Sequence, residues 1–120
     1  MAQGHAIQRG VRQSPRKMRL VVDLIRGQDV NAAYAILKLN KKHAAKQIGK
    51  TLKSAVANAE QKAVAARERF DLDELIISKA IVNGGRPLKR MHPAAQGRGT
   101  PVLKRTSHLE IHVRSREEKG

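Results

Sequence analysis

The fold is decided by residues 75–114, which read LIISKAIVNGGRPLKRMHPAAQGRGTPVLKRTSHLEIHVR. The stretch opens with a run of strand-forming residues and closes with LEIHVR at residues 109–114, where apolar and polar residues alternate. Such alternation is typical of a strand with one face in the core and the other in solvent. Residues 84–104 lie between the two strands and are rich in Gly and Pro. We therefore expect two antiparallel strands joined by a long connection.

This connection is either an unstructured loop or the outer part of a hairpin. If Leu75 pairs with Val113, the apex falls near Ala94, and about 20 residues at about 3.3 Å each give a length of about 65 Å. A globular chain of 120 residues has a radius of gyration of only about 14 Å. We therefore predict a protruding β-hairpin arm over residues 84–104. An isolated hairpin is marginal in water, so we expect a partner to order it.

The first half of the chain has helical periodicity. Ser14 and Pro15 are typical of a helix start, because Ser caps the N-terminus and Pro loses no hydrogen bond in the first turn. Gly27 ends this helix, and Asp29 can cap a second, short one. The apolar residues at helical spacing are Met18, Val21, Val22 and Ile25 in the first helix, and Ala33, Ile36 and Leu37, with Tyr34 beside them, in the second.

A third helix is expected over residues 41–65, with Asn40 at its start. At about 100° per residue, its apolar and basic residues fall on two separate arcs. The apolar arc is rich in Ala and predicts a close contact with a sheet or another helix. The basic arc predicts a surface that faces solvent or an anion. The apolar arc comprises Ala45, Ile48, Leu52, Ala55, Val56 and Ala59, and the basic arc comprises Lys42, Lys46, Lys50 and Lys53.

Together these elements predict an α+β fold in which three helices pack on a small antiparallel sheet and a long β-hairpin arm protrudes. Residues 5–12 can supply a further strand with Ile7 and Val11 on one face. The length allows one domain over residues 1–120. Its globular body is expected over residues 5–83 and 105–116, and its arm over residues 84–104.

Composition excludes several classes of protein. The chain has no Cys, which excludes disulfides and thiolate metal sites. Its longest apolar run, residues 32–37, is too short for a membrane span or the core of a signal peptide. With 40% hydrophobic residues, the chain is not a typical disordered tail.

The basic residues are concentrated rather than evenly spread. The chain has 25 Lys and Arg against 10 Asp and Glu, a net charge of +15. No acid precedes Asp23, and none lies in residues 30–59 or 75–109, whereas several gather in residues 68–74. A charge of this size repels itself in a compact monomer, and its usual partner is a polyanion. A membrane surface is less favoured, because the basic residues do not lie on one amphipathic helix.

No catalytic or metal-binding pattern is present. His108 and His112 are four residues apart, but in a strand they lie about 13 Å from each other, too far to share a zinc ion. Asp71, Asp73 and Glu74 are more typical of a solvated turn than of an acid–base pair. We therefore expect no enzymatic activity, no cofactor, no metal and no small-molecule substrate.

A nucleic-acid partner can be bound in more than one way. The chain is only 2% aromatic, which argues against a platform on which bases stack and leaves phosphate and shape contacts by Lys and Arg. A small DNA-binding protein with a helix-turn-helix over residues 14–60 is one alternative. A basic enzyme that acts on RNA is another, although it has no candidate residues here.

Several strings, in their order and spacing, resemble the bacterial-type family of large-subunit ribosomal protein number twenty-two, the exit-tunnel hairpin protein. The resemblance covers roughly residues 6–114. It departs from the family at Asn83, where an acid is common, at Ala95 and Gln96, where the tip is often more basic, and at Pro101 in the returning strand. The matching strings are SPRKMRLV at 14–21, DLIRG at 23–27, KKHAA at 41–45, KSAVANAE at 53–60, KR at 89–90, PA at 93–94, GR at 97–98 and LKRTSH at 103–108.

The resemblance implies a structural protein that binds 23S-type rRNA, supports early assembly of the large subunit and lines the nascent-polypeptide exit tunnel with its arm. Its implied partners are this rRNA, neighbouring ribosomal proteins and the nascent polypeptide, without a membrane. Its implied location is the cytoplasmic large subunit, with an organellar ribosome left open. The expected rRNA-binding residues are Arg12, Ser14, Arg16, Lys17, Arg19, Lys42, Lys46, Lys50, Lys53, Arg86, Lys89, Arg90, Arg98, Lys104, Arg105, Thr106, Ser107 and His108. The expected tunnel tip comprises Lys89, Arg90, Met91, His92, Pro93, Ala94, Ala95 and Gln96.

Overall fold

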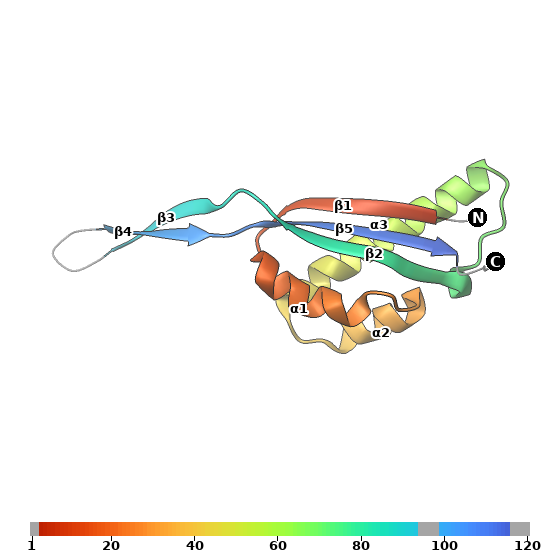
Figure 1. The fold of residues 1–120 in the computed structure, drawn as a ribbon, viewed down its shortest axis with the longest axis horizontal. Coiled ribbons are helices and arrows are strands. Elements are labelled where there is room, and N and C mark those ends of the chain that lie inside the picture. Colours follow the sequence, from red (N-terminus) through yellow and green to blue (C-terminus); the bar gives the residue numbers. More distant parts are fainter. Residues whose placement is uncertain (1–2, 94–98, 116–120) are drawn as a thin grey trace.

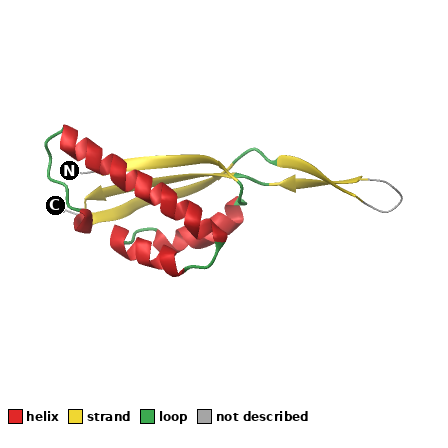
Figure 2. Cartoon of the chain, turned by 180° about the vertical axis from the view of Figure 1, so that it is seen from behind, coloured by secondary structure: helices red, strands yellow, loops and turns green. Residues whose placement is uncertain are grey.

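A computed structural model describes residues 3–93 and 99–115 of the chain. Three helices lie on one face of a three-stranded sheet (Figure 2), and a separate two-stranded sheet extends from one end of this body (Figure 1). The α+β class, with three helices on a small antiparallel sheet, is therefore confirmed. The elements are β1 (Gln3–Val11), α1 (Pro15–Ile25), α2 (Val30–Leu39), α3 (His43–Ala65), the 3₁₀ turn η1 (Leu72–Glu74), β2 (Leu75–Gly84), β3 (Leu88–Pro93), β4 (Gly99–Lys104) and β5 (Ser107–Ser115).

The three-stranded sheet has the order β1-β5-β2, and both pairings are antiparallel. The expected pairing of Leu75 with Val113 is wrong: Leu75 pairs with Ser115, and Val113 pairs with Ile77. A shift of two residues leaves every side chain on the same face of a strand, so apolar alternation cannot distinguish these registers. An irregularity at Ser78 then adds one residue to β2, which explains why its apolar pattern alternates poorly.

The predicted strand near the N-terminus exists, but Ile7 and Val11 do not share a face. Val11 is buried, whereas Ile7 is exposed. The register of β1 against β5 shifts between Gln8 and Val11, and Gly10 within this bulge has a φ of +66°. The extra residue moves Val11 onto the buried face, which it shares with Ala6.

The predicted helix ends are confirmed for α1. The Ser14 side chain accepts a hydrogen bond from the backbone N–H of Lys17 at 3.3 Å, and Pro15 is the first helical residue. Gly27 follows the last turn with a φ of +80°. The third helix begins at His43, two residues later than expected, because the side chain of Asn40 accepts from the backbone N–H of Lys42 in an extended lead-in.

The core lies between the helices and the covered face of the sheet. Its side chains are aliphatic and come from every helix and from all three strands of the larger sheet. The Ala-rich side of α3 allows β1 to approach closely. A Cβ atom added to Gly4 would lie 2.4 Å from the backbone nitrogen of Ala59 and 2.8 Å from the carbonyl oxygen of Ala55.

The two-stranded sheet pairs β3 with β4, from Leu88 opposite Lys104 to Pro93 opposite Gly99. It lies at one end of the long axis of the molecule, beyond the ends of β2 and β5 (Figure 1). The molecule measures 66 × 27 × 21 Å, and its radius of gyration of 17.8 Å exceeds the value of about 14 Å typical of a globular chain of this length. The full reach of an arm over residues 84–104 stays a prediction.

Candidate nucleic-acid interface

Hydrogen bonds hold the point at which the chain leaves the body for β3 and returns from β4. The backbone N–H of Gly85 donates to the carbonyl of Thr106 at 2.9 Å, and the Thr106 hydroxyl donates to the carbonyl of Arg86 at 2.6 Å. The backbone N–H of Gly10 donates to Nδ1 of His108 at 3.0 Å. These bonds tie the base of the β3–β4 hairpin to the sheet.

Two of the predicted binding residues, Thr106 and His108, therefore support this base, and a third, Ser107, is buried beside it. Thr106 is 6% exposed and Ser107 is fully buried, so neither presents its side chain at the surface. His108 is half-buried and holds the β1 bulge at Gly10. Sequence reasoning grouped the three with their basic neighbours because a contiguous string does not show which strand residues point inward.

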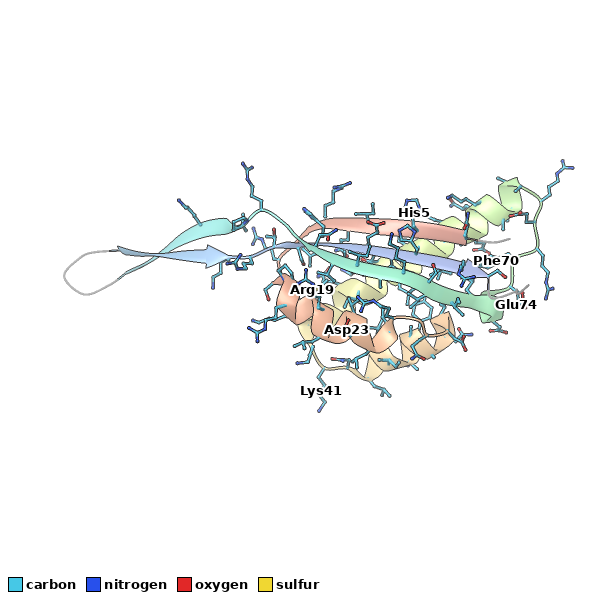
Figure 3. All side chains as sticks on the ribbon, viewed as in Figure 1. His5, Arg19, Asp23, Lys41, Phe70 and Glu74 are labelled. Carbon is cyan, nitrogen blue, oxygen red and sulfur yellow. The ribbon has the colours of Figure 1, made fainter. Side chains whose placement is uncertain are left out.

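The cations at the start of α1 lie beside this base. Arg16, Lys17 and Arg19 are all exposed. Arg19 donates from Nη2 to the carbonyl of Val82 in β2 at 2.8 Å, which holds the second turn of α1 against the sheet (Figure 3). Ser14 is engaged as the N-cap of the same helix. The start of α1 and the hairpin base therefore lie next to each other, and their cations form one basic region.

The lysines of α3 form a second basic region. Lys42, Lys46, Lys50 and Lys53 are exposed, whereas Ala45, Ile48 and Leu52 are buried. In the part of the chain that the structure covers, no ion pair to an acid is found for these four lysines. Their charge is therefore available to an external anion.

The hairpin and the segments that join it to the body carry further cations. Arg86, Lys89, Lys104 and Arg105 are exposed, and Arg12 is exposed next to the β1 bulge. Arg90, Met91, His92 and Pro93 belong to β3. Arg98 and the predicted tip residues Ala94, Ala95 and Gln96 lie outside the described residues.

The acids of residues 68–74 lie at the opposite end of the body. Figure 3 shows Glu74 at the end of the sheet that is far from the hairpin. Arg19 lies much nearer to the hairpin. Arg69 forms ion pairs with Asp71 at 3.6 Å and with Glu74 at 3.0 Å. The structure thus separates the acidic segment from the hairpin base, as the sequence pattern indicates.

The face of the sheet opposite the helices carries a cluster that sequence reasoning missed. The rings of His5 and His112 stack with centroids 5.1 Å apart, and Nε2 of His112 lies 2.5 Å from a carboxylate oxygen of Glu110. The hydrogen bond with His112 lowers the pKa of Glu110, and the charge of Lys79 adds to this effect. The alternation in β5 already places Glu110, His112 and Arg114 on one face, but the histidine stack depends on β1.

Two other kinds of site are absent from the parts of the chain that the structure describes. Within residues 3–93 and 99–115, no three His, Asp or Glu side chains gather as metal ligands. Over the same ranges, no helix is both long and apolar enough to cross a bilayer.

Comparison with known proteins assigns the chain to a family. The family model described as ribosomal protein L22p/L17e matches residues 6–114. The large ribosomal subunit protein uL22 of Oceanobacillus iheyensis is 47% identical over 116 residues, which cover 97% of this chain and 98% of that protein. The proteins of the same name from Pediococcus pentosaceus and Bacteroides fragilis are 50% and 48% identical, and the alignments cover 90% and 86% of this chain and 87% and 74% of those proteins. The chain therefore belongs to the ribosomal protein L22p/L17e family, whose members are structural, non-enzymatic components of the large ribosomal subunit.

Proposed function

We propose that this chain binds large-subunit rRNA through the basic region around the hairpin base and through the lysines of α3. The observation that carries the proposal is the position of the exposed cations: they surround the hairpin base and one side of α3, while the acids of residues 68–74 lie at the other end. Lys and Arg side chains in this arrangement bind phosphates and fix the orientation of a protein on folded RNA without reading bases.

The chain is proposed to act as one domain, with a body over residues 5–83 and 105–116 and an arm over residues 84–104. The body positions the arm, because hydrogen bonds at Gly85 and Thr106 fix the direction in which the chain leaves the sheet. In the assembled subunit the arm lines the exit tunnel, and its tip, residues 89–96, contacts the nascent polypeptide. The same contacts stabilise rRNA during early assembly, next to neighbouring ribosomal proteins.

The proposed binding residues divide into two groups. The cations contact phosphates directly, whereas Ser14, Thr106 and His108 hold the backbone that presents them, and Ser107 is buried. The phosphate-binding group comprises Arg12, Arg16, Lys17, Arg19, Lys42, Lys46, Lys50, Lys53, Arg86, Lys89, Arg90, Arg98, Lys104 and Arg105.

The test reverses two charges at the hairpin base. The double variant Lys104→Glu, Arg105→Glu should enter large subunits far less well than the wild-type chain, because two phosphate contacts become repulsions. The measurement is the ratio of variant to wild-type chain in purified subunits from cells that express both. Both side chains are exposed, so the thermal unfolding midpoint of the free protein should change little. Equal incorporation of the two chains would contradict a phosphate contact at this base.

A further inference from the structure

A groove runs along the outer side of β1, where this edge strand meets α3. Three adjoining cavities of about 200, 350 and 160 Å³ line this junction. Consecutive cavities involve neighbouring residues of β1, and the last two share His5 and Lys62. We name this feature the β1–α3 groove and define it by Lys50, Ser54, Asn58, Gln61 and Lys62 of α3 with His5 of β1.

The side of α3 that faces the groove is polar along most of its length. Lys50, Ser54, Asn58 and Gln61 recur three or four residues apart, so they lie on one side of the helix. Ser54, Gln61 and both lysines of the groove are exposed. Between Lys50 and Lys62 the groove follows the helix for about 18 Å, at about 1.5 Å per residue. This length suits an extended ligand rather than a single small molecule.

The charge of the groove favours an anion. The last cavity adds Arg114 and His112 of β5 to Lys62 and His5. None of the described acids lines any of the three cavities. The acid beside the groove, Glu110, has its carboxylate bound to His112. Cations near an open, solvent-accessible groove attract a polyanion.

The same groove is poorly suited to a peptide that would add a strand to the edge of β1. Asn58 donates from its side chain to the carbonyl of His5 at 2.8 Å. A side chain of α3 therefore already binds a backbone carbonyl of β1. Gln8 also points its side chain to α3, where it donates to Gln47 at 2.8 Å and accepts from Thr51 at 2.6 Å. Side chains from α3 therefore compete with strand addition.

We propose that the β1–α3 groove is a second RNA-binding site that holds a stretch of phosphodiester backbone, with Lys62 and Arg114 on phosphates and Ser54 and Gln61 as hydrogen-bonding groups. This site rests on the proposed rRNA-binding function and shares Lys50 with the α3 lysines of that proposal, but its Lys62 and Arg114 lie outside the residues named there. The chain would then hold two separate segments of rRNA, one at the hairpin base and one beside β1.

The test removes two charges from the groove of the full-length chain. The probe is a 23S-type rRNA transcript, and binding is measured by filter retention between 50 and 300 mM KCl. The double variant Lys62→Gln, Arg114→Gln should bind about tenfold more weakly at 100 mM salt, and its slope of log K against log salt should fall by about 1.4 to 1.8, since each lost phosphate contact removes about 0.7 to 0.9.

The matched control removes the same two charges elsewhere. Lys38 and Arg67 are exposed and line none of the three cavities, so Lys38→Gln, Arg67→Gln should leave most of the affinity and slope unchanged. The charge-preserving double variant Lys62→Arg, Arg114→Lys should bind like the wild-type chain. Equal losses in the groove and control variants, or no loss in the groove variant, would overturn the site.

The outcomes separate this site from the proposed function as a whole. If the wild-type chain binds the transcript and only Lys104→Glu, Arg105→Glu weakens it, the groove proposal fails while rRNA binding stands. If the wild-type chain does not bind, the proposed function itself fails. A photo-cross-linking residue in place of Gln61 should react with rRNA in assembled subunits. A cross-link to another ribosomal protein instead would show that a protein, not RNA, occupies the groove, and would overturn the proposal.

Discussion

At the scale of single residues, the glycine at position 4 decides how closely β1 and α3 approach. The atoms that a Cβ at this position would meet belong to the backbone of Ala55 and Ala59, which cannot rotate away. The Ala-rich side of α3 provides the flat surface for this contact, but its counterpart on β1 is a residue without any side chain. Packing at this point therefore depends on two elements that are far apart in the sequence.

Gly4→Ala should destabilise the protein by about 1–3 kcal/mol, because β1 or α3 must shift to relieve the overlap. The measurement is the free energy of unfolding in urea. Gly49→Ala is the matched control: it lies within α3, and a Cβ there meets nothing within 4 Å. This control should raise stability by up to about 1 kcal/mol, as expected for Ala replacing Gly in a helix. Equal stability of Gly4→Ala and wild type would show that β1 and α3 accommodate a Cβ at this position without loss of stability.

The hydrogen bond between Glu110 and His112 gives a pH dependence with a defined sign. Its effect is to lower the pKa of Glu110 in the folded chain. A carboxyl whose pKa is lowered by folding adds stability above its unfolded pKa, and this contribution is lost as the pH falls through the folded pKa. The free energy of unfolding should therefore be lower in Glu110→Gln than in wild type at pH 6, and the difference should fade as the pH falls below about 4.

The partner side of this bond supplies the control. His112→Gln should lose the same pH-dependent contribution, and the double variant should lose little more than either single variant, because both remove one interaction. Losses that simply add up would show that Glu110 and His112 stabilise the chain independently.

At the scale of elements, the connection between the two sheets is the point where the body sets the direction of the hairpin. Thr106 acts at this point with both its carbonyl and its hydroxyl, to Gly85 and to Arg86. A Cβ at Gly85 would lie 2.6 Å from the Thr106 hydroxyl, so the outgoing and returning segments of the chain lie very close to each other here. The position of β3 and β4 relative to the body thus depends on a few short-range contacts.

Thr106→Val keeps the shape of the side chain and removes the hydroxyl bond to Arg86. We expect a loss of about 1 kcal/mol, because the Arg86 carbonyl loses its partner, together with faster amide hydrogen exchange at Gly85. Ser54→Ala removes an exposed hydroxyl at a distance and should leave exchange at Gly85 unchanged. Unchanged exchange in Thr106→Val would mean that the hydroxyl does not fix the hairpin base.

At the scale of the whole molecule, the chain combines a body that has its own aliphatic core with a two-stranded hairpin that extends from this body. The core includes residues of β1, β2 and β5 and of all three helices. As a member of its family, the chain is a component of the large ribosomal subunit, which lies in the cytoplasm in bacteria. We therefore expect the net charge of +15 to be compensated by the surroundings in the subunit rather than within the chain.

Deletion of residues 86–104 tests how the body and the arm divide the binding. The remaining body should still associate with large subunits, because the cations of α1 and α3 are retained, but a high-salt wash should remove it more readily than the wild-type chain. Simple phosphate contacts weaken steeply with salt, whereas an arm threaded into folded RNA should not release. The measurement is the fraction of each chain that sediments with the subunit after the wash, and equal retention would contradict a threaded arm.

The sequence by itself determined which local structures form. Ser14, Pro15 and Gly27 mark the ends of α1 because capping and a positive φ are properties of single residues. The alternation of Leu109, Ile111 and Val113 likewise determined which face of β5 is buried. The clustering of basic and acidic residues was also evident from the sequence, because it depends only on the order of the residues.

Only the tertiary structure decided how these elements meet. The register of β2 against β5, the bulge that turns Val11 inward and the burial of Ser107 all depend on neighbours that are distant in the chain. The β1–α3 groove and the stacking of His5 on His112 likewise require residues from separate strands and helices. Propensity and periodicity act over a few residues, whereas register and packing are set by contacts between elements, which one-dimensional patterns do not encode.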